Sequence, residues 1–222
     1  MADRYHYLPS IGLAVMMAWG IPALIKSEAI RKKLLFPGGI TVLAILAVLT
    51  WQQCGYWKNS ITLFDHTLKV TDNNWLAYNN KGVTYYELGN YRQAIEDYNR
   101  VIGMKPGYVE AYLNRGVAYA RLGNYRQAIE DFNRAIEINP RHAKVYNNRG
   151  NTFFALGNYK QAIEDYGRAI EIDPGYAEAY NNRALVYLNQ GDNISGCRDA
   201  QKTCEFGNCK LLEMAKGKGD CR

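Results

Sequence analysis

Two long apolar runs without a charged residue open the chain. Residues 8–25 form the first run, and residues 34–53 form the second. As helices, each would span roughly 27–30 Å, about the hydrocarbon thickness of a bilayer. A pair of buried core helices is the alternative, but Pro22 and Pro37 would weaken a soluble helix more than a membrane one. The pattern therefore predicts a transmembrane hairpin over residues 1–54.

The loop between the two runs predicts the orientation of this hairpin. Residues 26–33 carry four basic side chains, Lys26, Arg31, Lys32 and Lys33. By the positive-inside rule this loop lies in the cytoplasm, so the chain after Cys54 lies outside it. A cleaved signal peptide would carry its basic residues before the apolar run and not after it. We expect a bacterial inner-membrane protein whose larger part is periplasmic.

The rest of the chain repeats with a period of 34 residues. The repeating positions include three sets of small or helix-ending residues: Gly82, Gly116 and Gly150; Gly89, Gly123, Gly157 and Gly191; Pro106, Pro140 and Pro174. This spacing predicts three full repeats, at 75–108, 109–142 and 143–176, and a partial copy at 177–192. Residues 55–74 align with the second half of a repeat and are expected to form a capping half-repeat.

The filled positions resemble the tetratricopeptide repeat, in which each unit is a pair of helices. The glycine at 89 and its equivalents would end the first helix in a left-handed conformation. The small residue at 82 and its equivalents would let the second helix approach closely. Because one unit cannot bury its own apolar face, neighbouring units must stack. The resemblance implies an all-α fold in which an α-solenoid follows the hairpin.

The charge distribution argues against a nucleic-acid ligand. The formal net charge is +6, of which residues 1–56 hold +3, residues 57–192 hold +1 and residues 193–222 hold +2. A protein that binds nucleic acid through phosphates needs a concentrated basic surface. No segment supplies such a surface. The basic residues of the loop at 26–33 are explained by their role in setting the orientation of the hairpin.

One asparagine position recurs in every repeat. In the family that the repeats resemble, this position lies on the first helix and faces the concave groove; here it is filled by Asn80, Asn114, Asn148 and Asn182. Asparagine also precedes it at Asn79, Asn147 and Asn181. A side-chain amide both donates and accepts, so such a column could hold the backbone of an extended peptide. It is similar to the asparagine ladder of O-GlcNAc transferase. The alternative is that these asparagines bond to a neighbouring repeat.

A second binding mode of the family is expected to be absent. Some members clamp a C-terminal carboxylate, and Asn114 and Lys144 match two of the clamp positions. Asn79, Val83 and Asn148 occupy positions where lysine, asparagine and arginine would be needed. A basic column beside the asparagines, made of Lys81, Arg115, Arg149 and Arg183, is expected to form ion pairs with the Glu-Asp pairs at 96–97, 130–131 and 164–165.

Four cysteines lie in the last 30 residues, which we expect to form a helical cap. They are Cys197, Cys204, Cys209 and Cys221. Outside the cytoplasm they predict two disulfides. Cys197 and Cys204 are about 10 Å apart on one predicted helix, too far to bridge. A second helix starting near Cys209 would suit the nested pairs 204–209 and 197–221. A zinc site is the alternative, although no C-x-x-C spacing is present.

No residue pattern indicates an active site, a metal or a cofactor. Residues 2–13 resemble the segment before the last membrane spans of glycosyltransferases with C-terminal tetratricopeptide repeats, such as the transmembrane O-mannosyltransferases. Two hypotheses follow. The first is a membrane-anchored extracytoplasmic scaffold that binds a protein or peptide in its groove and contacts the bilayer through two spans. The second is a non-catalytic C-terminal portion of a membrane glycosyltransferase that presents acceptor proteins.

Overall fold

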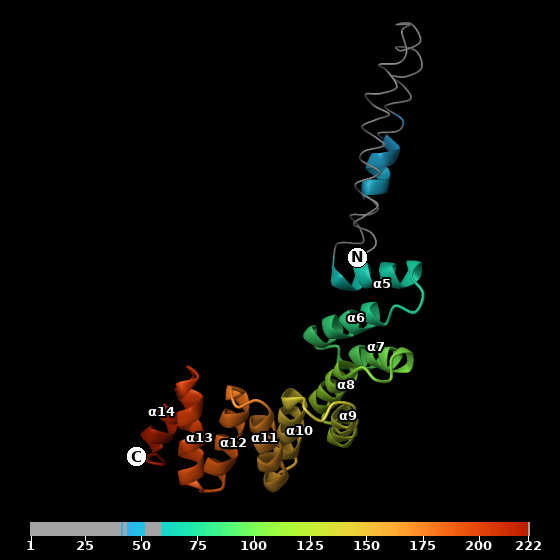
Figure 1. Cartoon of the computed structure of the whole chain (residues 1–222). Helices are drawn as coiled ribbons and strands as arrows, with labels where there is room; N and C mark the ends of the chain where they lie inside the picture. Colours follow the sequence, from blue (N-terminus) through green and yellow to red (C-terminus); the bar gives the residue numbers. More distant parts are fainter. Residues whose placement is uncertain (1–40, 42–43, 52–58, 222) are drawn as a thin grey trace, which may run out of the picture. The chain divides into compact units, whose positions relative to one another are not determined.

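The computed structural model describes residue 41 and residues 44–51 and 59–221, and their secondary structure is helical throughout (Figure 1). This confirms the all-α fold class. The chain divides into two compact units, Met1–Leu63 and Phe64–Arg222. The predicted hairpin lies outside the described residues, except for residues 41 and 44–51, which are helical. Within the described ranges, no helix has the length and apolar character that a membrane crossing requires.

The repeat region consists of helix pairs that follow one another along the chain (Figure 1). Each pair packs within itself, and the second helix of one pair contacts the first helix of the next. The helices are α5 (Ser60–Val70), α6 (Trp75–Glu87), α7 (Tyr91–Met104), α8 (Val109–Arg121), α9 (Tyr125–Ile138), α10 (Ala143–Ala155), α11 (Tyr159–Ile172), α12 (Ala177–Asn189), α13 (Asn193–Glu205) and α14 (Lys210–Lys218).

The turn within each pair depends on a glycine. Gly89 has a φ of 77°, in the left-handed region that side chains disfavour. Its N–H donates to the carbonyl of Tyr86, and the N–H of Asn90 donates to the carbonyl of Tyr85. These bonds satisfy carbonyls at the end of α6 and direct the chain into α7. Gly123, Gly157 and Gly191 repeat the conformation, so the predicted role of these glycines is confirmed.

The contact within each pair depends on a second glycine. A Cβ added to Gly150 would lie 2.7 Å from a ring carbon of Tyr166, and Gly82 and Gly116 meet Tyr98 and Phe132 at the same distance. The ring of the second helix therefore lies directly against the backbone of the first. In the last pair, Ala184 takes the glycine's place in a cluster with Ala200. A methyl group is accommodated there because the residue that replaces the ring is small.

The C-terminal residues continue the stack. The partial fourth copy predicted at 177–192 includes α12, and α13 packs on α12 as a second helix does in the earlier pairs. Helix α14 follows, and its Leu211 joins Ala184 and Ala200 in one apolar cluster. The region expected to form a cap thus contains the helix that completes the fourth pair, followed by one further helix.

Candidate functional site

The asparagine column lies on the first helix of each pair. Asn80, Asn114, Asn148 and Asn182 are half-buried on α6, α8, α10 and α12. The preceding asparagine of two repeats is buried, with Asn79 7% exposed and Asn147 fully buried. The column is therefore not uniform. Each repeat uses its asparagines differently, as the hydrogen bonds show.

The asparagines of the third and fourth repeats bond to one another. Asn182 Nδ2 donates to Asn147 Oδ1 and to Asn151 Oδ1, both at 3.0 Å. Asn147 Nδ2 donates to Glu178 Oε1 at 3.1 Å, and Asn151 Oδ1 accepts from Tyr166 Oη at 2.7 Å. We call Asn147, Asn151, Glu178 and Asn182 the C-terminal asparagine network. It joins α10 to α12, as the alternative interpretation of the column expects for these residues.

The same residue types in the first and second repeats do not form this network. Asn79, Glu110 and Asn114, which we call the N-terminal asparagine set, stand at the positions of Asn147, Glu178 and Asn182. Asn79 Oδ1 is buried and has no hydrogen-bond partner among the described residues. Asn79 Nδ2 donates to the adjacent Asn80 Oδ1 at 3.4 Å, near the limit for a hydrogen bond. The amide of Asn114 is therefore not bonded to Asn79.

The second and third repeats differ again. Leu113 occupies the position of Asn79 and Asn147 and is buried in the apolar core. Asn148 Nδ2 donates to the carbonyl of Lys144 on its own helix at 2.8 Å, and Lys144 itself is exposed. Of the predicted groove residues, Asn147 and Asn182 are thus brought together, whereas Asn148 contacts the backbone of α10.

The asparagines of the first two repeats have apolar neighbours. Val83 and Val117 follow Asn80 and Asn114 at a spacing of three residues, which places them on the same helix face. Both valines are half-buried, and Leu76, one turn before Asn80, is 50% exposed. In the third repeat, the residue equivalent to the two valines is Asn151.

The basic column forms buried ion pairs, as predicted. Arg149 donates from Nε and Nη2 to the two carboxylate oxygens of Asp165 at 2.8 and 2.7 Å, and from Nη1 to Asn133 Oδ1 at 2.6 Å. Arg115 bonds to Asp131 and Asn99 in the same way. Arg183 bonds to Asp199, a partner that sequence reasoning missed, although it lies at the same 16-residue separation.

The first repeat departs from this pattern. Lys81 Nζ lies 2.6 Å from Asp65 Oδ1 on α5. Asp97, at the position of Asp131 and Asp165, is 4% exposed and its Oδ2 has no hydrogen-bond partner among the described residues. Burial raises the pKa of Asp97, and the charges of Lys81 and Arg100 only partly oppose this. Burial also raises the pKa of Asp165, where hydrogen bonds from Arg149 act in the opposite direction.

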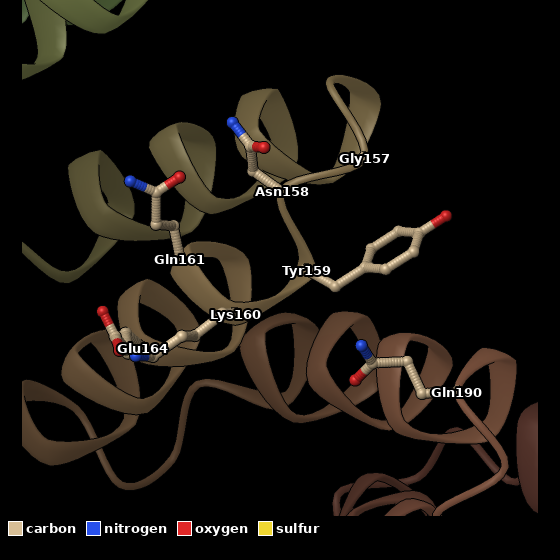
Figure 2. A pocket seen from close by; sticks show the side chains of 7 residues that line it. All are labelled: Gly157, Asn158, Tyr159, Lys160, Gln161, Glu164 and Gln190. Carbon is tan, nitrogen blue, oxygen red and sulfur yellow. The ribbon is translucent and has the colours of Figure 1, made fainter.

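A polar hollow of about 580 Å³ lies apart from the predicted groove residues. Figure 2 shows its lining: Gly157, Asn158, Tyr159, Lys160, Gln161, Glu164 and Gln190. Most come from the start of α11, and Gln190 follows the end of α12. The sequence did not indicate this hollow, because its residues are turn and surface positions of the repeat. Within the described ranges, no group of His, Cys, Asp or Glu residues could hold a metal ion.

The cysteines pair as the helix geometry predicts. Cys197 is bonded to Cys221, and Cys204 to Cys209, with Cα–Cα distances of 5.6 and 4.0 Å. The Cys204–Cys209 bond closes the turn at Gly207, and Cys209 is the N-cap of α14. The Cys197–Cys221 bond ties the end of the chain to α13. The two disulfides therefore fix α14 to the repeat stack.

The architecture defines a class, an α-solenoid of helix pairs with a period of 34 residues. Family models for the TPR repeat match residues 82–123 and 150–191, and models for the tetratricopeptide repeat match 109–142, 63–96 and 132–164. Together they cover residues 63–191 without a break, more than half of the chain. The chain belongs to the tetratricopeptide repeat family, as its sequence pattern predicts.

Solved structures support this assignment. The crystal structure of MamA is 28% identical with a TM-score of 0.62, covering 75% of this chain and 94% of that one. The first TPR of Spaghetti (RPAP3) bound to the HSP90 peptide SRMEEVD is 31% identical with a TM-score of 0.51, covering 55% and 98%. MamA from Desulfovibrio magneticus RS-1, 17% identical with a TM-score of 0.61, shares the fold and covers 78% and 96%.

The resemblance to glycosyltransferases gains no support. No curated protein matches the chain. Residues 2–13, which carry that resemblance, lie outside the described residues. The family models match residues within 63–191 and none before them. We therefore do not extend the glycosyltransferase hypothesis.

Proposed function

We propose that this chain is a membrane-anchored scaffold that binds an extended segment of a protein or peptide in the concave groove of its repeats. The observation that carries the proposal is the asparagine at one groove position of all four first helices. Asparagine is a mediocre helix former, so four in register call for a reason other than helix stability. A side-chain amide offers a peptide backbone both a donor and an acceptor.

The structural neighbours support a peptide ligand. The RPAP3 domain, similar to half of this chain, is bound to an HSP90 peptide. The mode of binding would differ here, because Asn79 stands at a clamp position that requires lysine and is itself buried. The ligand we propose is therefore held along its backbone, and a free C-terminal carboxylate is not required.

Two features support an anchored, extracytoplasmic placement. The uncharged runs at 8–25 and 34–53 are long enough to span a bilayer, and the basic loop between them favours the cytoplasmic side. The two disulfides at the C-terminus are typical of an oxidising compartment. On this proposal the repeats lie in the periplasm of a bacterium, close to its inner membrane.

Separate experiments test the binding and the placement. For binding, the full chain in detergent micelles is used to select peptides from a phage-displayed library of random twelve-residue sequences. We expect enriched peptides whose affinity falls in the Asn114→Ala/Asn148→Ala double variant at unchanged helicity. No enrichment, or unchanged affinity in the variant, would refute a groove ligand.

For the placement, intact spheroplasts are treated with protease. We expect the repeats to be degraded, and mass spectrometry of alkylated protein to find Cys197, Cys204, Cys209 and Cys221 without free thiols. Repeats that stay protected, together with four alkylated thiols, would contradict an extracytoplasmic domain. This result would leave the binding proposal untouched, because the groove does not depend on the compartment.

A further inference from the structure

We propose that the ligand binds the N-terminal half of the groove, with Asn80 and Asn114 holding the backbone of an extended peptide that carries an aliphatic side chain. Asn147 and Asn182 instead join the third repeat to the fourth. This inference rests on the proposed function and deepens it. It divides a column that looks uniform in the sequence into a binding half and a structural half.

Two equivalent sets of residues in the two halves of the groove differ in their hydrogen bonds. In the C-terminal asparagine network, Asn182 donates to Asn147 Oδ1 across the repeat boundary at 3.0 Å. In the N-terminal asparagine set, the equivalent acceptor, Asn79 Oδ1, is buried and unpartnered among the described residues. A buried polar atom without a partner costs free energy, so native structures rarely leave one unpaired. The amide of Asn114 remains available to another acceptor.

The difference arises from the number of acceptors that face the amide. Asn182 Nδ2 is held by two acceptors at once, Asn147 Oδ1 and Asn151 Oδ1. Tyr166 Oη also donates to Asn151 Oδ1, which fixes the orientation of that side chain. In the first repeat, Val83 stands at the position of Asn151 and offers no acceptor. Nothing therefore draws the Asn114 amide towards α6, and it stays half-buried at the groove position.

Apolar side chains lie beside the asparagines of the N-terminal half. Val83 and Val117 lie half-buried beside Asn80 and Asn114, and Leu76 is half-exposed one turn earlier. An extended peptide places alternate side chains on opposite faces, so one bonded to the asparagines would direct a side chain onto the valines. An aliphatic side chain is the favoured contact, because it would remove this apolar surface from water.

The C-terminal half offers no equivalent surface. The position that Val83 and Val117 fill in the first two repeats is Asn151 in the third, where it already belongs to the C-terminal asparagine network. In the fourth repeat it is Leu185, which packs against the last apolar cluster, formed by Ala184, Ala200 and Leu211 of α14. Helix α14 is held there by the two disulfides. The surface that would receive a ligand's side chain is thus covered by the chain itself.

The test uses a peptide enriched from the random twelve-residue library on the full chain in micelles, with its Kd measured by fluorescence polarisation. Each of Asn80→Ala and Asn114→Ala is expected to raise the Kd by about tenfold, the effect of losing one good hydrogen bond. Asn147→Ala and Asn182→Ala are expected to leave the Kd within about twofold while lowering the unfolding temperature. Far-UV circular dichroism checks that each variant is folded.

A matched pair of variants exchanges the two states. Val83→Asn supplies the acceptor that Asn151 supplies in the third repeat, so it should draw Asn114 into a network with Asn79. We expect it to weaken binding by about tenfold and to raise the unfolding temperature, which a damaged groove would not do. Asn151→Val, which changes only the other half, should retain binding.

The outcomes separate this inference from the proposed function. If Asn147→Ala and Asn182→Ala weaken binding as much as Asn80→Ala and Asn114→Ala, or more, the division of the groove is wrong and the groove still binds peptide. If Val83→Asn binds as tightly as the unchanged chain, the assigned cause is wrong and the inference fails with it. If the library yields no peptide, or none of the four alanine variants alters the Kd, the proposed function itself is refuted.

Discussion

The first and third repeats share a sequence pattern but pair their buried polar groups differently. In the third repeat, the carboxylate of Asp165 is bonded at both oxygens, and Asn147 is bonded at both ends of its amide. In the first repeat, Asp97 and Asn79 each leave one buried oxygen unpartnered among the described residues. The comparison teaches that a repeat can keep its fold while its buried hydrogen bonds are incomplete.

Residue differences at two equivalent positions of the repeats account for this difference in pairing. Arg149 reaches Asp165 and Asn133 together because a guanidinium carries several donors in a fixed fork. Lys81 has one ammonium group, and it lies 2.6 Å from Asp65, leaving Asp97 without a hydrogen bond from it. Asn151 supplies the acceptor that Val83 lacks. The first repeat therefore carries an unpaired buried oxygen on each of its two helices, at Asn79 and at Asp97.

The largest expected effect comes from removing the arginine that the third repeat depends on. Arg149→Met leaves Asp165 buried without its bidentate partner, which should cost about 3 kcal/mol of unfolding free energy. Lys81→Met should cost less than about 1 kcal/mol, because its partner Asp65 is half-exposed and the pair is screened by water. Urea denaturation of both variants measures the losses. Equal losses would mean that the two ion pairs contribute equally to stability, which would contradict the difference between the first and third repeats.

Neutralising the two equivalent aspartates should give effects of opposite sign. Asp165→Asn loses two charge-assisted hydrogen bonds from Arg149 and should destabilise the chain by about 2 kcal/mol. Asp97→Asn removes a buried charge without a hydrogen-bonded partner and should stabilise it by about 1 kcal/mol. Thermal unfolding at pH 7 follows both. Destabilisation by Asp97→Asn would show that Lys81 already compensates the buried carboxylate.

Lys81→Arg should give the first repeat the pairing of the third. A guanidinium at this position could bond to Asp65 and Asp97 together, as Arg115 and Arg149 bond to their two partners. We expect a gain of about 1 kcal/mol, the net value of a satisfied buried hydrogen bond. A double-mutant cycle with Asp97→Asn measures the coupling. Zero coupling would place the new guanidinium away from Asp97.

The smallest effect is the contribution of Asp97 to the pH dependence of stability. Burial raises the pKa of its carboxyl in the folded chain above the unfolded value. Protonation therefore favours folding, and this contribution is complete below the unfolded pKa and lost as the pH rises through the folded pKa. The advantage of Asp97→Asn over the unchanged chain should be full at pH 7 and vanish as the pH falls. An advantage that is constant between pH 7 and 4 would contradict the raised pKa.

The sequence predicted most of the backbone because repetition constrains it. Gly89 and Gly150 recur for conformational and steric reasons that the 34-residue period exposes. Helix spacing excluded a Cys197–Cys204 bond, since these residues lie two turns apart on α13, and the expected second helix near Cys209 favoured the nested pairs. Such features depend on where a residue sits along a helix, which spacing alone determines.

The choice among side-chain partners was not predictable in the same way. The period placed Asn79 and Asn147 at equivalent positions, yet only Asn147 is bonded across the repeat boundary. That outcome depends on a third residue, Val83 or Asn151, one turn along the helix. Likewise Lys81 and Arg149 share a position, but the number of donors decides which carboxylate is bonded. Hydrogen-bond choices depend on combinations of residues that no single repeat position reveals.

The central claim is that the groove binds an extended peptide through the asparagines that the fold leaves open. Its most direct test is an NMR titration of the side-chain amides of the ¹⁵N-labelled full chain in micelles with an enriched peptide. We predict that the amide resonances of Asn80 and Asn114 shift to saturation while those of Asn147 and Asn182, already bonded within the protein, stay in place. Shifts at Asn147 and Asn182 without shifts at Asn80 and Asn114 would contradict the account.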